Sequence, residues 1–148
     1  MAEPTLFKDG YVAFTTATGS ATYTHLSGSK SVEVPFSKAE LANSVFGDVA
    51  ETFFPGIISA PISIVYRQDF GAAGVDKTLW DRWNSETKFR LKLRPVNTTV
   101  STTNPSYIFN RVGVFSISPI NGAHGVLLEN KAELRILSGG TLTRSTAT

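Results

Sequence analysis

The chain has 148 residues, of which 41% are hydrophobic and only 18% are charged, and its formal net charge is +2. This length fits a single domain with a buried core, and the composition excludes a disordered chain. The small net charge gives no indication of a dedicated nucleic-acid-binding protein. The absence of cysteine excludes disulfides, thiolate metal sites and thiol nucleophiles. No apolar run approaches the roughly 18 residues that span a bilayer, and the first residues lack a signal-peptide profile, so we expect a soluble protein without membrane contact.

The amino-terminal part is expected to contain an arm and two strands. Residues 1–8 resemble an arm, and the Asp9-Gly10 pair after them favours a turn. One strand is predicted within the Thr-rich stretch Tyr11–Tyr23. A second is indicated by the period-2 spacing of Val32, Val34 and Phe36.

The next stretch, Ser37–Gly56, has no clear period. It is predicted to be a long structured loop, although Lys38–Ala42 could form a helical turn. Large apolar groups on an irregular connection are also what an assembly surface needs, and both interpretations stay open. For the second, the candidate contacts between subunits or rings are Phe36, Leu41, Phe46, Phe53, Phe54 and Pro55.

A strand and a helix are predicted next along the chain. Alternate residues from Ile58 to Tyr66 are apolar, which is typical of a half-buried strand. The only convincing helix covers residues 75–84. It places Val75, Leu79 and Trp83 at i, i+4 and i+8, so these three are predicted to form its core contact with the sheet.

The most regular strand pattern covers Lys88–Arg94 and separates apolar from basic residues. Phe89, Leu91 and Leu93 alternate with four cations. These cations suggest a solvated face that discourages edge pairing, or a salt-bridged subunit contact, and less readily a DNA contact. The charged interface candidates are Lys88, Arg90, Lys92 and Arg94.

The last third of the chain is predicted to be β-rich. A polar loop at Asn97–Pro105 precedes a central strand at Tyr107–Ser118, which is apolar on both faces. A turn then leads to a strand at Val126–Leu137. Residues 138–148 are expected to be a mobile tail unless a partner holds them. No repeat or linker divides the chain, so residues 1–148 are expected to form one domain.

The search for catalytic chemistry finds no motif. The two histidines, His25 and His124, lie in Gly- and Ser-rich stretches without metal-ligand spacing, and no nucleophile elbow, phosphate loop or dinucleotide fingerprint occurs. The acidic residues are dispersed and form no calcium loop. We therefore expect no enzyme activity, no catalytic residue, no bound metal and no cofactor.

The order of several segments resembles the major tail tube proteins of long-tailed, non-contractile bacteriophages. The resemblance covers roughly Val32 to Arg144. It is carried by structural segments, which are Phe46-Gly47-Asp48, Phe53-Phe54-Pro55-Gly56, the Ile-rich strand to Gln68-Asp69-Phe70, Val75-Asp76-Lys77-Thr78-Leu79-Trp80, the Lys88–Pro95 strand, Thr102-Thr103-Asn104-Pro105-Ser106-Tyr107, Ser118-Pro119-Ile120-Asn121-Gly122 and Leu142-Thr143-Arg144.

This resemblance implies a mainly β fold, a two-sheet sandwich or barrel-like body with one flanking helix and a long loop. It implies a virion protein, assembled in the host bacterial cytoplasm, whose six-fold rings stack into a tail tube. Phage DNA would pass through the lumen without sequence-specific binding. Implied partners are further copies of the chain and the tape measure, tail terminator and distal tail proteins. The basic strand is expected at an interface or outside the lumen.

Two other functions remain open at this stage. One is a capsid decoration or head–tail connector protein of a tailed phage. The other is a carbohydrate-binding sandwich, which a concave row of exposed aromatic residues would favour.

Overall fold

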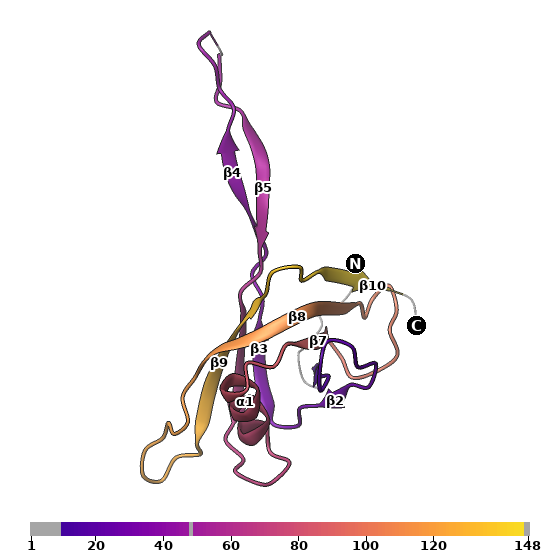
Figure 1. Ribbon diagram of the computed structural model, residues 1–148, viewed down its shortest axis with the longest axis vertical. Coiled ribbons are helices and arrows are strands. Elements are labelled where there is room, and N and C mark those ends of the chain that lie inside the picture. The colour runs from indigo at the N-terminus through magenta and orange to yellow at the C-terminus, as the bar shows by residue number, and fades with distance from the viewer. Residues whose placement is uncertain (1–9, 48, 147–148) are drawn as a thin grey trace.

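The computed structural model describes residues 10–47 and 49–146, which form ten strands and one helix. The predicted arm at residues 1–8 lies outside the described residues. Most strands form one antiparallel sheet in the order β2-β1-β7-β8-β9-β6-β3, with β10 paired to β8, and β4 and β5 form a separate hairpin (Figure 1). The elements are β1 Tyr11–Phe14, β2 Thr24–His25, β3 Ser29–Glu33, β4 Ser37–Ala42, β5 Phe53–Ser59, β6 Ile62–Arg67, α1 Val75–Asn84, β7 Phe89–Arg94, β8 Ser106–Ile117, β9 Glu129–Ile136 and β10 Leu142–Ser145.

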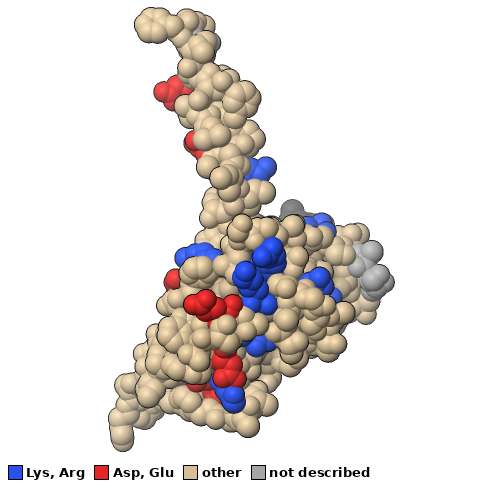
Figure 2. All heavy atoms as spheres, viewed as in Figure 1, with Lys and Arg blue, Asp and Glu red and all other residues tan. Residues whose placement is uncertain are grey.

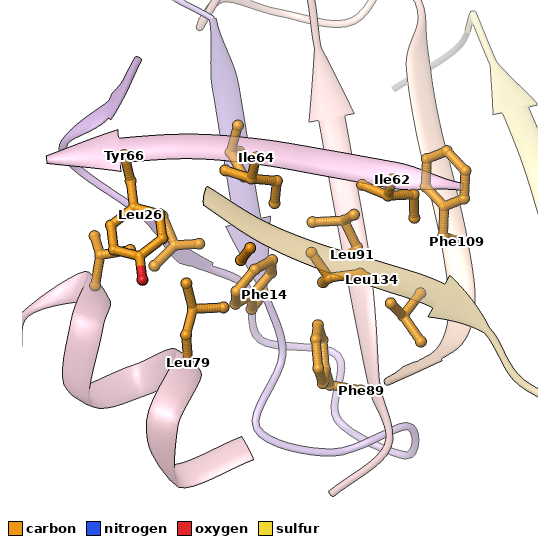
Figure 3. Close-up of a cluster of buried hydrophobic side chains, with 14 of the residues drawn as sticks. Phe14, Leu26, Ile62, Ile64, Tyr66, Leu79, Phe89, Leu91, Phe109 and Leu134 are labelled. Atoms are coloured by element: carbon orange, nitrogen blue, oxygen red, sulfur yellow. The ribbon is translucent and has the colours of Figure 1, made fainter. Parts of the chain in front are cut away.

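The core lies between two parts of the large sheet. Side chains from β6 and β9 meet those of β1, β7 and β8, and the helix closes one side of this cluster (Figure 3). The alternation in β6 produces this packing, because Ile62, Ile64 and Tyr66 point inward and are buried while the residues between them are not. The prediction of a mainly β fold with two sheets and one short helix is confirmed.

The strand predicted from Ile58 to Tyr66 is in fact two strands that belong to different sheets. β5 ends at Ser59 and β6 begins at Ile62, so Ile58 lies on the exposed hairpin rather than in the core. Pro61 stands between them, and proline has no N–H with which to continue a ladder. The alternation of apolar residues in the sequence continues across Ala60 and Pro61, because the end of β5 and the start of β6 are both rich in isoleucine.

The helix has the predicted bounds, but one of its three predicted core residues is wrong. Val75 and Leu79 are buried, whereas Trp83 is 42% exposed. At about 100° per residue, position 83 lies about 80° around the helix from Val75, while position 82 lies only about 20° away. Arg82 therefore occupies the inward position.

The long strand β8 is central, as predicted, and contains a bulge at residues 110–111. Phe89 pairs with Val112 and Leu91 with Phe109, so β8 has one extra residue opposite β7. Arg111 has φ of 55° there, and both Phe109 and Val112 point into the core. Beyond the bulge the strand pairs with β9, and before it with β10.

Part of the carboxy-terminal tail is a strand of the sheet. Residues Leu142–Ser145 form β10, which pairs with β8 from Leu142 opposite Phe109 to Ser145 opposite Ser106. Leu142 packs against the core. The mobile tail that the Thr-rich composition indicated is therefore held, up to Ser145, by the chain itself.

Candidate assembly surfaces

The β4–β5 hairpin projects from the body along the longest axis of the molecule (Figure 1). Its strands pair from Ser37 opposite Ser59 to Ala42 opposite Phe53, so the prediction of a long loop at Ser37–Gly56 is wrong. The helical turn considered for Lys38–Ala42 is also wrong, because pairing with β5 overrides the helix propensity of Ala and Leu. The signal for β5 in the sequence is a pair of phenylalanines, Phe53 and Phe54, followed by the β-branched pair Ile57 and Ile58.

The hairpin exposes the apolar side chains that were considered as contact candidates. Phe46 near the tip is fully exposed, and Leu41, Phe53 and Phe54 are all more than half exposed. Pro55 is exposed too, in β5 opposite Glu40. The hairpin is also mostly free of charged atoms in the space-filling view (Figure 2). The structure thus brings these candidates together on one projecting element.

A glycine lets the two hairpin strands approach closely. Gly56 faces Ala39 across the pair, and a Cβ at this position would lie 3.0 Å from both the Cβ and the carbonyl oxygen of Ala39. The register also shifts here, with one more residue in β5 than in β4 between two successive pairs. A small residue is therefore required at the bulge of the hairpin.

Phe36 differs from the other contact candidates because it lies at the root of the hairpin. Its ring centroid is 6.3 Å from those of Tyr107 and Phe109 in β8. Next to this root is a hollow of about 480 Å³, lined by Ile57, Ile58 and the body residues Ile136 and Leu142, among others. The root is thus attached to the body, whereas the rest of the hairpin extends away from it.

The basic strand β7 is confirmed as an alternating strand, and its outward side chains contact aromatic rings. The Arg94 guanidinium lies 3.9 Å from the centroid of Tyr11, and the Lys92 ammonium 5.2 Å from that of Tyr23. Arg90 donates from Nε to Oδ1 of Asn110 at 3.3 Å. Burial lowers the pKa of Lys92, and the neighbouring Arg94 charge lowers it further.

The cations of β7 differ from those of β9 in their ionic partners. Lys131 and Arg135 in β9 lie 3.4 Å and 3.8 Å from the carboxylate of Glu133. Within residues 10–47 and 49–146, by contrast, the salt bridges include none of Lys88, Arg90, Lys92 and Arg94. Basic side chains gather over the middle of the visible face of the body (Figure 2). The stripe predicted from the sequence is therefore an area of positive charge that forms no salt bridge with an acid among the described residues.

A second apolar surface surrounds the carboxyl end of α1 and was missed from the sequence. The rings of Trp80 and Trp83 lie in tilted contact, with centroids 5.2 Å apart, and both are exposed. Trp83 also borders a groove of about 520 Å³ with Phe115 and Leu137. The only signal in the sequence was the pair of tryptophans three residues apart on a helix.

No group of three or more His, Asp or Glu residues that could hold a metal ion occurs among the described residues. His25 is exposed and stacks on Tyr11, with ring centroids 5.1 Å apart. None of the described helices is long and apolar enough to cross a membrane.

Comparison with known proteins shows the fold of the chain. No family model matches the sequence, and no curated protein does. A subunit of the SPP1 tail tube superposes with a TM-score of 0.76 at 11% identity, over 97% of this chain and 80% of that one. A chain from the virion of a native gene transfer agent particle gives 0.68 at 11% identity, over 92% and 96%.

A contractile system has the same architecture. A chain of the sheath–tube complex of PVC, an extracellular contractile injection system, in its extended state gives a TM-score of 0.68 at 11% identity, over 97% of this chain and 93% of that one. The chain therefore has the tail-tube fold.

Proposed function

We propose that this protein is a tail tube protein, a structural component of a phage tail without enzyme activity. Copies of the chain form six-membered rings, and the rings stack into the tube through which DNA passes. The tail-tube fold supports this proposal, as does the similarity to a gene transfer agent tail of C6 symmetry, with a TM-score of 0.67 at 15% identity over 92% of this chain and 96% of that one.

The observation that carries the proposal is the projecting hairpin. Its phenylalanines are exposed in the isolated subunit, and burial of one such side chain is worth on the order of 2 kcal/mol. A monomeric protein rarely presents a long apolar hairpin to solvent, since it invites association. In a stack of rings, each subunit would contribute one hairpin to the next ring, so the stacking contacts form cooperatively.

The charge distribution suggests where β7 lies in such a tube. Positive charge in a lumen would retain DNA, so we place the basic strand at a contact with a neighbouring subunit or outside the lumen. The DNA then moves past without sequence-specific binding. Tape measure, tail terminator and distal tail proteins are the further partners that this function requires.

Removal of the hairpin tests the proposal. Ser37 and Ser59 are direct cross-strand partners, so a four-residue Gly-Ser linker can replace Lys38–Ile58 without moving the body. Negative-stain microscopy of the unaltered protein at increasing concentration is expected to show rings and tubes. The variant is expected to retain β-rich circular dichroism and the melting temperature of the body, and to form no long tubes.

Three outcomes would change the proposal. Tubes of normal length from the hairpin variant would remove the stacking role. Loss of the fold in the variant would show that the hairpin belongs to the core of the subunit. If the unaltered protein stays monomeric or trimeric at every concentration, the alternative is a capsid decoration or head–tail connector protein.

A further inference from the structure

The connection between β8 and β9, residues 118–128, lies near the end of the molecule opposite the hairpin tip (Figure 1). Residues 121–127 are all exposed, and even the large apolar side chains of Ile120, Val126 and Leu127 are 78%, 65% and 67% exposed. Burial of apolar surface therefore contributes little to holding this connection on the body. Polar contacts have to hold it instead.

Two residues supply these contacts. The N–H of Asn121 donates to Oε1 of Gln68 at 3.3 Å, and its Nδ2 donates to the carbonyl oxygen of Glu129 at 3.2 Å. Gln68 donates from Nε2 to the carbonyl oxygen of Pro119 at 2.8 Å, and from its N–H to that of Leu128 at 2.9 Å. These four hydrogen bonds form a latch that joins the connection to the end of β6 and the start of β9.

The latch contains an amide that its own backbone can attack. Asn121 is followed by Gly122, which has no Cβ to obstruct the approach of its nitrogen to the Asn121 side chain. Both residues are exposed, and within residues 10–47 and 49–146 the N–H of Gly122 takes part in no hydrogen bond. Packing favours glycine here, since a Cβ would lie 1.9 Å from Cδ2 of Leu128.

The structure distinguishes Asn121 from other asparagines of the chain. At Asn84 and Asn97, the N–H of the following residue donates to a backbone carbonyl, at 3.0 Å and 2.9 Å. Asn104 is buried and is followed by proline, which has no N–H. Asn43 is exposed but is followed by serine, whose Cβ obstructs the approach. An accessible carboxamide and an unobstructed, exposed neighbouring nitrogen thus occur together at Asn121.

We propose that Asn121 is a site of spontaneous deamidation, and that this modification releases the β8–β9 connection from the body. The backbone nitrogen of Gly122 forms a bond to Cγ of Asn121, and the bond from Cγ to Nδ2 breaks. The proton of the attacking nitrogen leaves with Nδ2 as ammonia, and a cyclic succinimide remains. Water then opens the ring at either carbonyl and gives aspartate or isoaspartate. Neither part of the proposal depends on the tube function.

Either product breaks the latch. A carboxylate at position 121 has no hydrogen to donate to the carbonyl oxygen of Glu129, and it places a negative charge beside that oxygen. Isoaspartate also inserts a methylene group into the backbone before Gly122. The new charge borders a hollow of about 600 Å³ that Lys30 and Glu129 also line, where these two form a salt bridge at 2.6 Å. The carboxylate therefore competes with Glu129 for Lys30.

Peptide mapping by mass spectrometry tests the reaction. The full-length protein is incubated at neutral pH, and the conversion of each asparagine is followed over time. Asn121 is expected to accumulate aspartate and isoaspartate while Asn84 and Asn97 stay unmodified. Asn121→Gln is expected to remain an amide, because its longer side chain would have to close a larger ring. Conversion at Asn121 that is no faster than at Asn84 would overturn the proposal.

Hydrogen exchange tests the release of the connection. Asn121→Asp reproduces one product, and Asn43→Asp is the matched control, because it adds the same charge on the exposed hairpin. The reporter is the Gln68 N–H, which lies 53 residues from Asn121 in the chain, so the substitution does not alter its intrinsic exchange rate. One lost hydrogen bond corresponds to about a tenfold change in a local opening equilibrium.

The Gln68 N–H is therefore expected to exchange about tenfold faster in Asn121→Asp and in the incubated protein, and at the original rate in Asn43→Asp. Exchange in β7 should not change in any of them. An unchanged Gln68 rate in Asn121→Asp would overturn the release. Faster exchange throughout the body would overturn it as well, since the substitution would then lower the stability of the whole subunit.

Discussion

Arg82 connects the helix to the core at the scale of single residues. Its guanidinium carbon lies 5.0 Å from the ring centroid of Phe89 and 5.6 Å from that of Phe14, and it donates from Nη2 to the carbonyl oxygen of Thr15 at 2.6 Å. Burial lowers the pKa of Arg82, but the contact with two rings and a carbonyl still favours the cation. The helix thus packs on the sheet through Val75, Leu79 and the guanidinium group of Arg82.

This packing predicts losses of stability of different size for two substitutions on α1. Leu79→Ala is expected to lower the free energy of unfolding by about 3 kcal/mol, because it leaves a cavity in the core. Trp83→Ala is expected to lower it by about 1 kcal/mol or less, since it removes mainly the exposed contact with Trp80. Urea denaturation of both variants measures the difference. Equal losses would mean that Trp83 belongs to the core.

At the scale of elements, Tyr66 joins β6 to the start of the helix. Its side chain is buried in the core cluster (Figure 3). Its hydroxyl lies beside the side chains of Asp76 and Asn130. Burial, followed by the negative charge of Asp76, raises the pKa of Tyr66 to about 12. Gly74 precedes the helix where a Cβ would lie 2.0 Å from the carbonyl oxygen of Asp69, so the entry to α1 is tightly packed as well.

The raised pKa predicts a loss of stability in strong alkali. The phenol has a pKa of 10.0 in the unfolded chain and about 12 in the fold, so the unfolded chain releases its proton first. The protonated phenol of Tyr66 therefore makes its full contribution to the free energy of unfolding below pH 10. The free energy of unfolding is expected to fall by about 2 kcal/mol between pH 10 and 12. Tyr66→Phe is the control, because its free energy of unfolding should lack this part of the decrease. Identical alkaline profiles for both proteins would contradict the prediction.

At the scale of the whole molecule, the body has one outer face with internally paired charges and another whose cations form no salt bridge within residues 10–47 and 49–146. The β9 face balances Lys131 and Arg135 against Glu133, whereas on the β7 face Lys92 and Arg94 lie over tyrosine rings. A protein that only needed solubility would have no reason to separate its charges in this way. We therefore keep the prediction that acids of a neighbouring subunit pair with the β7 cations.

That prediction can be tested through salt. Screening shortens from about 10 Å at 0.1 M to about 3 Å at 1 M salt, so the concentration needed for assembly should rise several-fold over this range. Arg90→Gln with Arg94→Gln should weaken assembly and flatten this dependence. Lys131→Gln with Arg135→Gln serves as the control and should preserve it. Light scattering measures the assembly of the unaltered protein and of the two double variants at each salt concentration. If the Arg90/Arg94 variant has the same salt dependence as the unaltered protein, the β7 stripe is only a solvated face.

Where one face of an element is buried, the sequence was a reliable guide. The bounds of α1 and the alternation of β7 follow from apolar spacing, since burial on one side imposes the period of the backbone on the sequence. The mainly β fold follows from the same patterns. The projecting hairpin could not be found this way, because apolar groups on both faces remove the period.

Only the tertiary structure decided how these elements meet. The contact of Tyr11 with Arg94 depends on pairing β1 with β7, which are more than 70 residues apart in the chain, and no local pattern records it. Whether Arg82 or Trp83 faces the core depends on how α1 is rotated about its axis against the sheet, because adjacent helical residues point about 100° apart. The sequence by itself determined the elements that bury one face, because local burial patterns specify them. The surfaces available for assembly were decided by long-range pairing, which places residues side by side irrespective of their spacing along the chain.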